Sequence, residues 1–376
     1  MILPLLAMIP AAPPPTLSLP APIVTVPGEL APSVLSFRAG PARCEGGEER
    51  LAREEPPLPV IAGLGPATGS LAPVALRFRI DSTGRPLSIV EEPRQNRAGP
   101  YFNGRDVIAA FAASQFRPGG ERSGCTIAYQ VAAQPIGEAD PEILYRFVAL
   151  QPAPSFDARR AVFERIVPAG SNCFGDRNLN VRLRAYPAFE EIAQPPGTLS
   201  FSFVGFDLDS SGRPQNVRLL GSGGNSELDR QSLDAVRRSR FSPIAKRGCT
   251  YSYWRRQTEP LRPPEPPRAD AGRPDSAPCP DEATGWAYMP PLGFPAEFER
   301  RAIEGWAVLK FDVAPWGGVG NVSVVAAEPA APFGQQAAQI VSASRKAPSA
   351  RGYTGCVARV LFRLPNPGDT GPMLEP

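Results

Sequence analysis

The chain has 376 residues, including 48 prolines and 35 glycines, and 42% of its residues are hydrophobic. This length allows two to four small domains, and so much proline excludes a mostly helical bundle, because each proline inside a helix costs about 3 kcal/mol. The 40 basic and 37 acidic residues leave a net charge of +3, which gives no reason to expect a nucleic-acid partner. Small domains joined by proline-rich connections are therefore predicted.

The chain contains no histidine. This absence removes the commonest metal ligand and the commonest general base, and it excludes catalytic triads and zinc sites that depend on histidine. No nucleophile in the sequence has a plausible base beside it. We therefore predict that the protein is not an enzyme and has no catalytic residue, no metal site and no cofactor.

Residues 1–9 form a short apolar run that leads into a proline-rich stretch. A helix that spans a bilayer needs about 20 apolar residues, whereas a run of this length suits the core of a signal peptide. The run lacks the basic n-region and the clean cleavage site of a signal peptide. The sequence therefore leaves open the alternative that the true start codon lies further upstream. No later segment is long enough to cross a membrane, and we expect an exported, soluble protein.

One sequence unit occurs three times. Residues 78–86 (FRIDSTGRP) are echoed by residues 206–214 (FDLDSSGRP) and more weakly by residues 311–319 (FDVAPWGGV). Further along, the segments QFRP, RFSP and RKAP end at positions 118, 243 and 348, and a Gly-Cys pair follows each of them. An internal repeat decides the architecture before any local pattern does. We define unit 1 as residues 34–136, unit 2 as residues 170–258 and unit 3 as residues 276–364.

The remaining segments are assigned as connections. Residues 1–33 are the signal-like segment with a proline-rich linker, residues 137–169 a connector, residues 259–275 a second proline-rich linker, and residues 365–376 a tail. Residues 260–267 (PLRPPEPP) should be extended and semi-rigid, reaching about 3 Å per residue. We expect separate units joined by stiff connections. The sequence leaves open whether the units also pack against one another.

Each unit contains one early and one late cysteine, at nearly constant distances from the turn glycine. The early cysteines are Cys44, Cys173 and Cys279, and the late ones are Cys125, Cys249 and Cys356. This register predicts the disulfides Cys44–Cys125, Cys173–Cys249 and Cys279–Cys356. Disulfides of this kind indicate an oxidising compartment. Free buried thiols and a metal site are the competing interpretations, and the metal site has neither a Cys-x-x-Cys pair nor a histidine to complete it.

Within a unit, the pattern predicts a strand, a tight hairpin, a second strand, a helix and a third strand. In unit 2 the helix should open at Asn225 and turn Leu228 and Val236 toward the sheet, because asparagine is a good N-cap. The third strand should begin at the late cysteine and cover residues 249–254. The fold class is therefore α+β, with one helix packed on a three-stranded antiparallel sheet in every unit.

Three motifs that could indicate chemistry fit local structure better. Residues 81–84 and 209–212 place two residues between aspartate and glycine, unlike the active-site motif of aspartic proteases, and a hairpin turn is the better interpretation. Residues 221–225 lack the lysine of a phosphate-binding loop and fit a loop with an N-cap. The arginines at positions 237, 238 and 240 favour the end of a helix and a solvated face over an anion site.

Unit 2, from Tyr186 and Pro187 through the DSSG turn to Tyr251, resembles the C-terminal domain of TonB-family energy transducers. Unit 3 is similar to the first half of that domain, from Phe294 and Pro295 onward, and unit 1 resembles it around its turn and its QFRP segment. The chain is thus identified as three tandem diverged copies of a TonB C-terminal-like unit, each with an intra-unit disulfide.

The resemblance implies a binding function. Domains of this family bind the periplasmic side of outer-membrane transporters, whose N-terminal segment adds a strand to the sheet. Strand addition suits a three-stranded unit with an open edge. In this chain the partner strand would lie along residues 249–254 or their counterparts. The implied partner-binding residues are Tyr186, Pro187, Phe294, Pro295, Tyr251 and Tyr253.

Two functional hypotheses follow. The first is a non-enzymatic periplasmic protein that binds extended peptide or protein partners, TonB-dependent outer-membrane transporters among them, in association with TonB-dependent transport. An energy transducer with an anchor upstream of Met1 is a variant of it. The alternative is a structural protein of the cell envelope that binds peptidoglycan.

Overall fold

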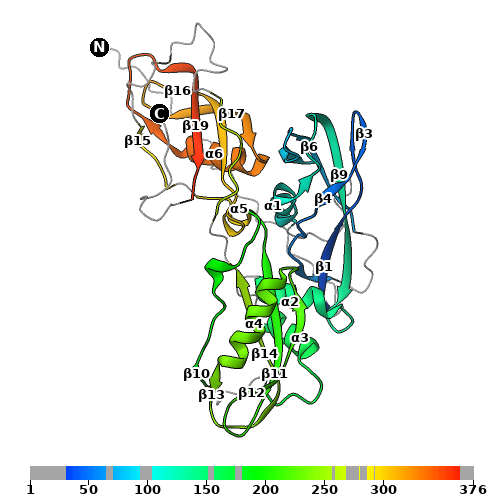
Figure 1. Cartoon of the computed structure of the whole chain (residues 1–376). Helices are drawn as coiled ribbons and strands as arrows, with labels where there is room; N and C mark the ends of the chain where they lie inside the picture. Colours follow the sequence, from blue (N-terminus) through cyan, green and yellow to red (C-terminus); the bar gives the residue numbers. More distant parts are fainter. Residues whose placement is uncertain are drawn as a thin grey trace, which may run out of the picture.

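The computed structural model describes residues 31–64, 71–93, 104–150, 156–173, 180–255, 259–267, 279, 286–291 and 293–364. Within these ranges the fold is α+β, with several small antiparallel sheets, six α-helices and three disulfides. Figure 1 shows three lobes, in blue to cyan, green, and orange to red. The signal-like run of residues 1–9 and the tail lie outside the described residues.

Unit 1 contradicts the expectation of a three-stranded sheet, because its sheet has seven strands in the part of the chain described. The expected core is present: β6 (Val74–Ile80) pairs with β7 (Pro86–Glu91) on one side and with β9 (Arg122–Pro135) on the other. Helix α1 (Arg105–Ala113) contributes its buried side chains to the core of this unit.

The four additional strands of unit 1 come from the segment around the early cysteine, which carries no strong strand pattern. They are β1 (Ala31–Ala39), β2 (Ala42–Cys44), β3 (Gly47–Glu49) and β5 (Val60–Leu64). Because β9 runs well beyond the end of β6, it offers them a long edge, and both β1 and β2 pair with it.

Unit 2 has the expected core, a sheet in the order β12-β11-β14. Its strands are β11 (Ser200–Leu208), β12 (Pro214–Ser222) and β14 (Lys246–Arg255). Helix α4 (Ser226–Arg238) begins where the sequence predicts, because the side-chain oxygen of Asn225 accepts the Leu228 N–H at 3.0 Å. The side chains of Leu228 and Val236 are buried, as expected.

Unit 3 repeats this arrangement with a sheet in the order β17-β16-β19. The strands are β16 (Gly305–Val313), β17 (Val319–Glu328) and β19 (Tyr353–Phe362), with α6 (Ala331–Ala343) packed on them and α5 (Ala296–Arg300) ahead of the sheet. Each unit also has a short two-stranded ribbon. The ribbons are β4 (Leu51–Arg53) with β8 (Gln115–Phe116), β10 (Val181–Leu183) with β13 (Arg240–Phe241), and β15 (Trp286–Tyr288) with β18 (Arg345–Lys346).

The connector between units 1 and 2 is helical. It contains α2 (Pro141–Leu150) and α3 (Phe156–Ile166). The ring of Tyr145 in α2 stacks on Phe203 of β11 with centroids 4.6 Å apart, whereas the next residue, Val204, packs in the cluster that contains α4 side chains. Since neighbouring residues of a strand point to opposite faces, the sheet of unit 2 carries helices on both faces.

The hairpin turns are confirmed as turns. The side chain of Asp81 accepts the N–H groups of Thr83 and Arg85, both at 2.9 Å, and Asp209 accepts those of Ser211 and Arg213 in the same way. The turn glycine in unit 1, Gly84, has a φ of +88°, and a Cβ there would lie 2.3 Å from the carbonyl oxygen of Phe116. Only glycine fits this position.

The three disulfides are confirmed. They join Cys44 to Cys125, Cys173 to Cys249 and Cys279 to Cys356. Each ties the segment ahead of the first core strand to the third core strand of the same unit, so that every bridge lies within one unit.

The units pack against one another around a buried ionic junction. Arg301, directly after α5 of unit 3, is fully buried and donates to the carboxylates of Asp106 and Glu55 in unit 1, both at 2.7 Å. Glu55 also accepts the backbone N–H of Leu199 in unit 2 at 3.0 Å and lies 3.6 Å from Arg146 of α2. Of the possibilities left open by the sequence, packing between the units is the one observed.

A second contact joins units 1 and 3. The buried carboxylate of Glu328, at the end of β17, accepts the backbone N–H of Ser88 at 2.6 Å and the Arg79 guanidinium at 2.8 Å. Beside it, the Ile89 N–H donates to the Pro329 carbonyl at 3.0 Å.

None of the helices in the described ranges has both the length and the apolar character needed to cross a membrane.

Candidate functional site: an open sheet edge in unit 2

The third core strand of unit 2 has one edge to which no described strand is bound. β14 pairs with β11 from Ser200 opposite Arg255 to Leu208 opposite Lys246, and none of the strands in the described ranges pairs with its other side. β19 has the same position in unit 3 and pairs only with β16 among the described strands. Such an edge presents backbone donors and acceptors that another extended chain can pair with.

The three units can be compared residue by residue along this strand. Cys125, Cys249 and Cys356 each lie opposite a phenylalanine of the central strand, at positions 78, 206 and 311. Ser252 in unit 2 is therefore equivalent to Ala128 in unit 1, whose carbonyl accepts the Gly40 N–H at 2.9 Å on the outer side. Because N–H and C=O directions alternate along an antiparallel strand, Thr250, Ser252 and Trp254 direct their backbone groups outward.

A strip of aromatic and basic side chains lies beside this edge. We name it the tyrosine strip, and it consists of Arg184, Tyr186, Tyr251 and Tyr253. The rings of Tyr251 and Tyr253 have centroids 4.9 Å apart, and the Arg184 guanidinium lies 4.9 Å from the Tyr251 centroid. The Tyr186 ring, which is 54% exposed, lies at 6.4 Å from that of Tyr253.

The hydroxyl of Tyr253 anchors the strip. It donates to the Ala185 carbonyl at 3.0 Å, and burial raises the pKa of Tyr253 to about 12. The N–H of Ala185 in turn donates to Ser239 Oγ at 3.1 Å, and Arg238 donates to the Tyr186 carbonyl at 3.2 Å. These bonds fix the backbone under Tyr186, so the exposed ring is held next to the edge.

A carboxylate fixes the beginning of the edge strand. Asp207 accepts the Gly248 N–H and the Asn216 amide, both at 2.8 Å, and the bond from Asn216 is the main reason why the pKa of Asp207 lies below its usual value. Unit 3 repeats the arrangement with Asp312, which accepts the Gly355 N–H at 2.8 Å and the Asn321 amide at 2.7 Å. A charged acceptor therefore holds the third strand in register in both units.

The structure places the six predicted partner-binding residues in two locations. Tyr186, Tyr251 and Tyr253 lie together in the tyrosine strip, and Pro187 follows Tyr186 but is buried. Phe294 is half-buried in unit 3 and packs edge-on against Phe333, with centroids 5.9 Å apart, and Pro295 is buried at the start of α5. These last two contribute to packing in unit 3 and do not reach the strip.

Sequence reasoning missed Arg184, and it included Trp254 in the predicted edge without naming it as a partner-binding residue. Trp254 is 48% exposed and lies on the opposite face of β14 from Tyr253, as the alternation of residues 251–254 implies. Arg184 precedes the Tyr-Pro pair by two residues, and no sequence pattern links it to Tyr251.

In the described ranges, no group of three or more acidic or cysteine side chains is placed to hold a metal ion.

Comparison with known families agrees with this geometry. Two regions of the chain match the family of the Gram-negative bacterial TonB protein C-terminal. The matches cover residues 186–258 and 290–364, which lie in units 2 and 3, and they do not confirm a third copy in unit 1. The TonB C-terminal family is a non-catalytic domain family, its members interact with proteins such as outer-membrane transporters, and TonB-like domains are periplasmic. No curated protein gives a significant match to the chain.

The first TonB C-terminal match begins at Tyr186 and contains the whole of β14. Three of the four residues of the tyrosine strip and the open edge therefore belong to the matched region, and Arg184 lies two residues ahead of it.

Proposed function

We propose that the protein is a non-enzymatic periplasmic protein that binds an extended segment of a protein partner by strand addition to β14, with outer-membrane transporters as the partner class. The observation that carries this proposal is the edge of β14, to which no described strand is bound and which lies beside the tyrosine strip, where the Tyr186 ring is exposed. The match of this region to the TonB C-terminal family supports it.

The energetics favour a modest affinity with side-chain selection. Each backbone hydrogen bond to the guest contributes about 1 kcal/mol net, because the bonds replace bonds to water. The exposed rings of Tyr186 and Trp254 add apolar area on the two faces of the guest strand, and aromatic side chains bury much area at little entropic cost. Arg184 favours a guest with a carboxylate at the neighbouring position.

The proposal is tested with a proline substitution at Ser252. Proline removes the outward N–H of this residue and leaves the bonds to β11 in place. The probe is a synthetic peptide with the N-terminal box of a TonB-dependent outer-membrane transporter, and its affinity is measured by calorimetry. We expect Ser252→Pro to weaken binding about tenfold or more, while Ser252→Ala, which keeps the N–H, binds as the unchanged protein does.

A second variant tests the side-chain part. Tyr186→Ala removes an exposed ring and should weaken binding of the same peptide about tenfold, because a ring at the centre of an interface contributes on the order of 1–2 kcal/mol. Unchanged affinity in both Ser252→Pro and Tyr186→Ala would show that the peptide does not use this edge. The comparisons give no support to the alternative of a peptidoglycan-binding structural protein.

A further inference from the structure

The edge that is open in unit 2 is covered in unit 1 by the chain itself. Strand β1 pairs with β9 from Ser33 opposite Pro135 to Ala39 opposite Tyr129. The cover continues past the end of β1: the Gly40 N–H donates to the Ala128 carbonyl at 2.9 Å, and β2 pairs with β9 at Thr126. Residues 33–45 therefore occupy the whole outer edge of β9.

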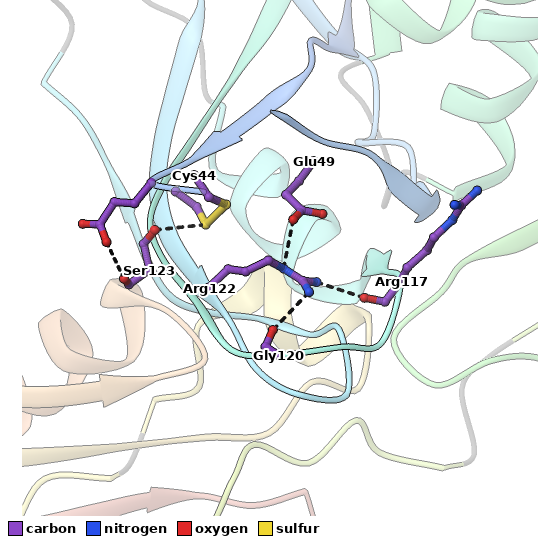
Figure 2. The surroundings of a disulfide bond; sticks show 8 residues. Cys44, Glu49, Arg117, Gly120, Arg122 and Ser123 are labelled. Atoms are coloured by element: carbon purple, nitrogen blue, oxygen red, sulfur yellow. Dashed lines mark hydrogen bonds and ion pairs between the residues drawn. A yellow bond between two sulfur atoms is a disulfide. The ribbon is translucent and has the colours of Figure 1, made fainter. Parts of the chain in front are cut away.

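Side chains and the disulfide fasten this cover. Cys44, at the end of β2, is bonded to Cys125 of the strand that it covers. Figure 2 shows Arg122 of β9 reaching toward Glu49 of β3 on one side of the bridge, with Ser123 on the other side. The Arg122 guanidinium lies 3.4 Å from the Glu49 carboxylate, and the Ser123 hydroxyl donates to Glu45 at 2.9 Å. The segment is thus held on the edge by covalent, ionic and backbone contacts together.

Unit 2 lacks this cover because the equivalent segment folds differently. Residues ahead of Cys173 form helix α3 instead of a strand. Only the last residues before the cysteine reach the edge strand, where the Asn172 N–H donates to the Arg247 carbonyl at 3.2 Å. The edge beyond it, at Thr250, Ser252 and Trp254, has no strand partner in the described ranges.

The covering strand also resembles a guest in how its side chains lie. Leu35, Phe37 and Ala39 pack in the cluster of α1 and Tyr129, the position equivalent to Tyr253. The neighbouring residue Val34 packs in the cluster of α2 and β11. A strand added to β14 would likewise present alternate side chains to the face with the tyrosine strip and to the face with Trp254.

We propose that β1 is a built-in guest strand, which closes unit 1 to partners and confines strand addition to the open edges of units 2 and 3. This inference rests on the proposed function for its biological meaning, since it states which units take the partner. The three units then have different tasks: unit 1 carries its own occupant, and units 2 and 3 receive one from outside.

Hydrogen exchange of individual amides in the full-length protein tests the inference. In β9 the N–H groups of Gln130, Ala132 and Gln134 face β1, whereas those of Ile127 and Tyr129 face β6. The double variant Ser36→Pro and Arg38→Pro removes two β1 donors that point at β9, because these residues alternate in register with Gly40. We expect exchange at the three outer amides to speed up about tenfold or more, with the two inner amides unchanged.

Addition of the missing strand from outside then gives the decisive measurement. The probe is a synthetic peptide with the sequence of residues 31–40. It should restore slow exchange at Gln130, Ala132 and Gln134 of the double variant, and it should leave these amides unchanged in the unaltered protein, where the edge is already filled.

Matched controls separate the backbone effect from other causes. Ala39→Pro places a proline in the same strand, but its lost N–H points away from β9, and Arg38→Ala removes only an exposed side chain. Both should keep slow exchange at the outer amides. If the double variant loses protection at the inner amides as well, β1 is an integral core strand and the inference is overturned. The same holds if the peptide fails to restore protection.

This experiment is independent of any external partner. Failure of the transporter peptide to bind β14 would contradict the proposed function and leave the exchange result untouched. Conversely, slow exchange at Thr250, Ser252 and Trp254 in the unaltered protein would show that the edge of unit 2 is also filled, and it would overturn the assignment of separate tasks to the units.

Discussion

Arg301 is the side chain that joins unit 3 to unit 1 at the buried ionic junction. It is fully buried, and the two carboxylates that it contacts lie in another unit, almost 200 and 250 positions earlier in the sequence. Removing one partner of a buried ion pair is costly because it leaves charge without compensation in a medium of low polarity. Surface pairs such as Arg160–Glu164, whose side chains are largely exposed, contribute far less.

We therefore expect Arg301→Ala to lower the free energy of unfolding by about 3–5 kcal/mol, measured by urea denaturation. Arg160→Ala is the matched control, with an expected loss of no more than about 1 kcal/mol. Equal losses in the two variants would contradict the importance given to the buried junction.

The junction also predicts an acid-sensitive stability. Burial alone would raise the pKa of Asp106, but the charge and hydrogen bonds of Arg301 outweigh it and hold this pKa below the ordinary value of 3.8. A carboxylate with a lowered pKa in the folded state stabilises the protein above its unfolded pKa, and this contribution is lost as the pH falls through the folded value.

In the unaltered protein the free energy of unfolding should thus decrease as the pH falls below about 4. Asp106→Asn should be less stable at pH 7 and should show a shallower decrease over the same acid range. Chemical denaturation at a series of pH values measures both slopes, and parallel curves would exclude Asp106 as a source of the acid sensitivity.

Among the helices and strands, those with local signals could be predicted from the sequence. The Asp-Ser-Ser-Gly turn, the Asn225 cap and the three disulfides all follow from short patterns or constant spacings, and each is found. Strand β1 and helices α2 and α3 could not be assigned, because their side chains are buried by residues far away in the chain. The role of Arg301 could not be predicted for the same reason, because its partners Glu55 and Asp106 are far away in the sequence and no local pattern links them to it.

Loss of the second disulfide should weaken unit 2 in particular. Cys173 and Cys249 are 76 positions apart, and a loop of this length stabilises the folded state by about 4 kcal/mol in the chain-entropy model. The double variant Cys173→Ala and Cys249→Ala should lose about this amount in urea denaturation. The loss should appear as faster hydrogen exchange in β11 and β14, and uniform changes in all three units would contradict a local effect.

Two separate polar contacts join the three units, in addition to apolar packing. The junction at Glu55 joins unit 1 to both of the others, and the carboxylate of Glu328 joins units 1 and 3 a second time. Two contacts at different places resist rotation of unit 3 against unit 1 better than one contact does. Local sequence patterns could not predict these contacts between units, because the residues that form them are far apart in the sequence.

Glu328→Ala tests this arrangement. The change leaves the Ser88 N–H without its charged acceptor and removes the pair with Arg79, while the bond from Ile89 to Pro329 stays. We expect the unaltered protein to unfold in one calorimetric transition and Glu328→Ala to unfold in two, because unit 3 then unfolds separately from unit 1. Arg160→Ala again serves as the control and should keep one transition; a single transition in Glu328→Ala would contradict the expectation.

The burial of Arg301 between its two carboxylates has a practical consequence for anyone who dissects this gene. A fragment that contains unit 3 alone would keep the Arg301 guanidinium but lack the two carboxylates of unit 1 that it binds. It would also expose the apolar side chains of unit 3 that pack against unit 1. Fragments ending at the apparent repeat boundaries should therefore be poorly soluble, and replacing Arg301 by methionine offers the simplest remedy.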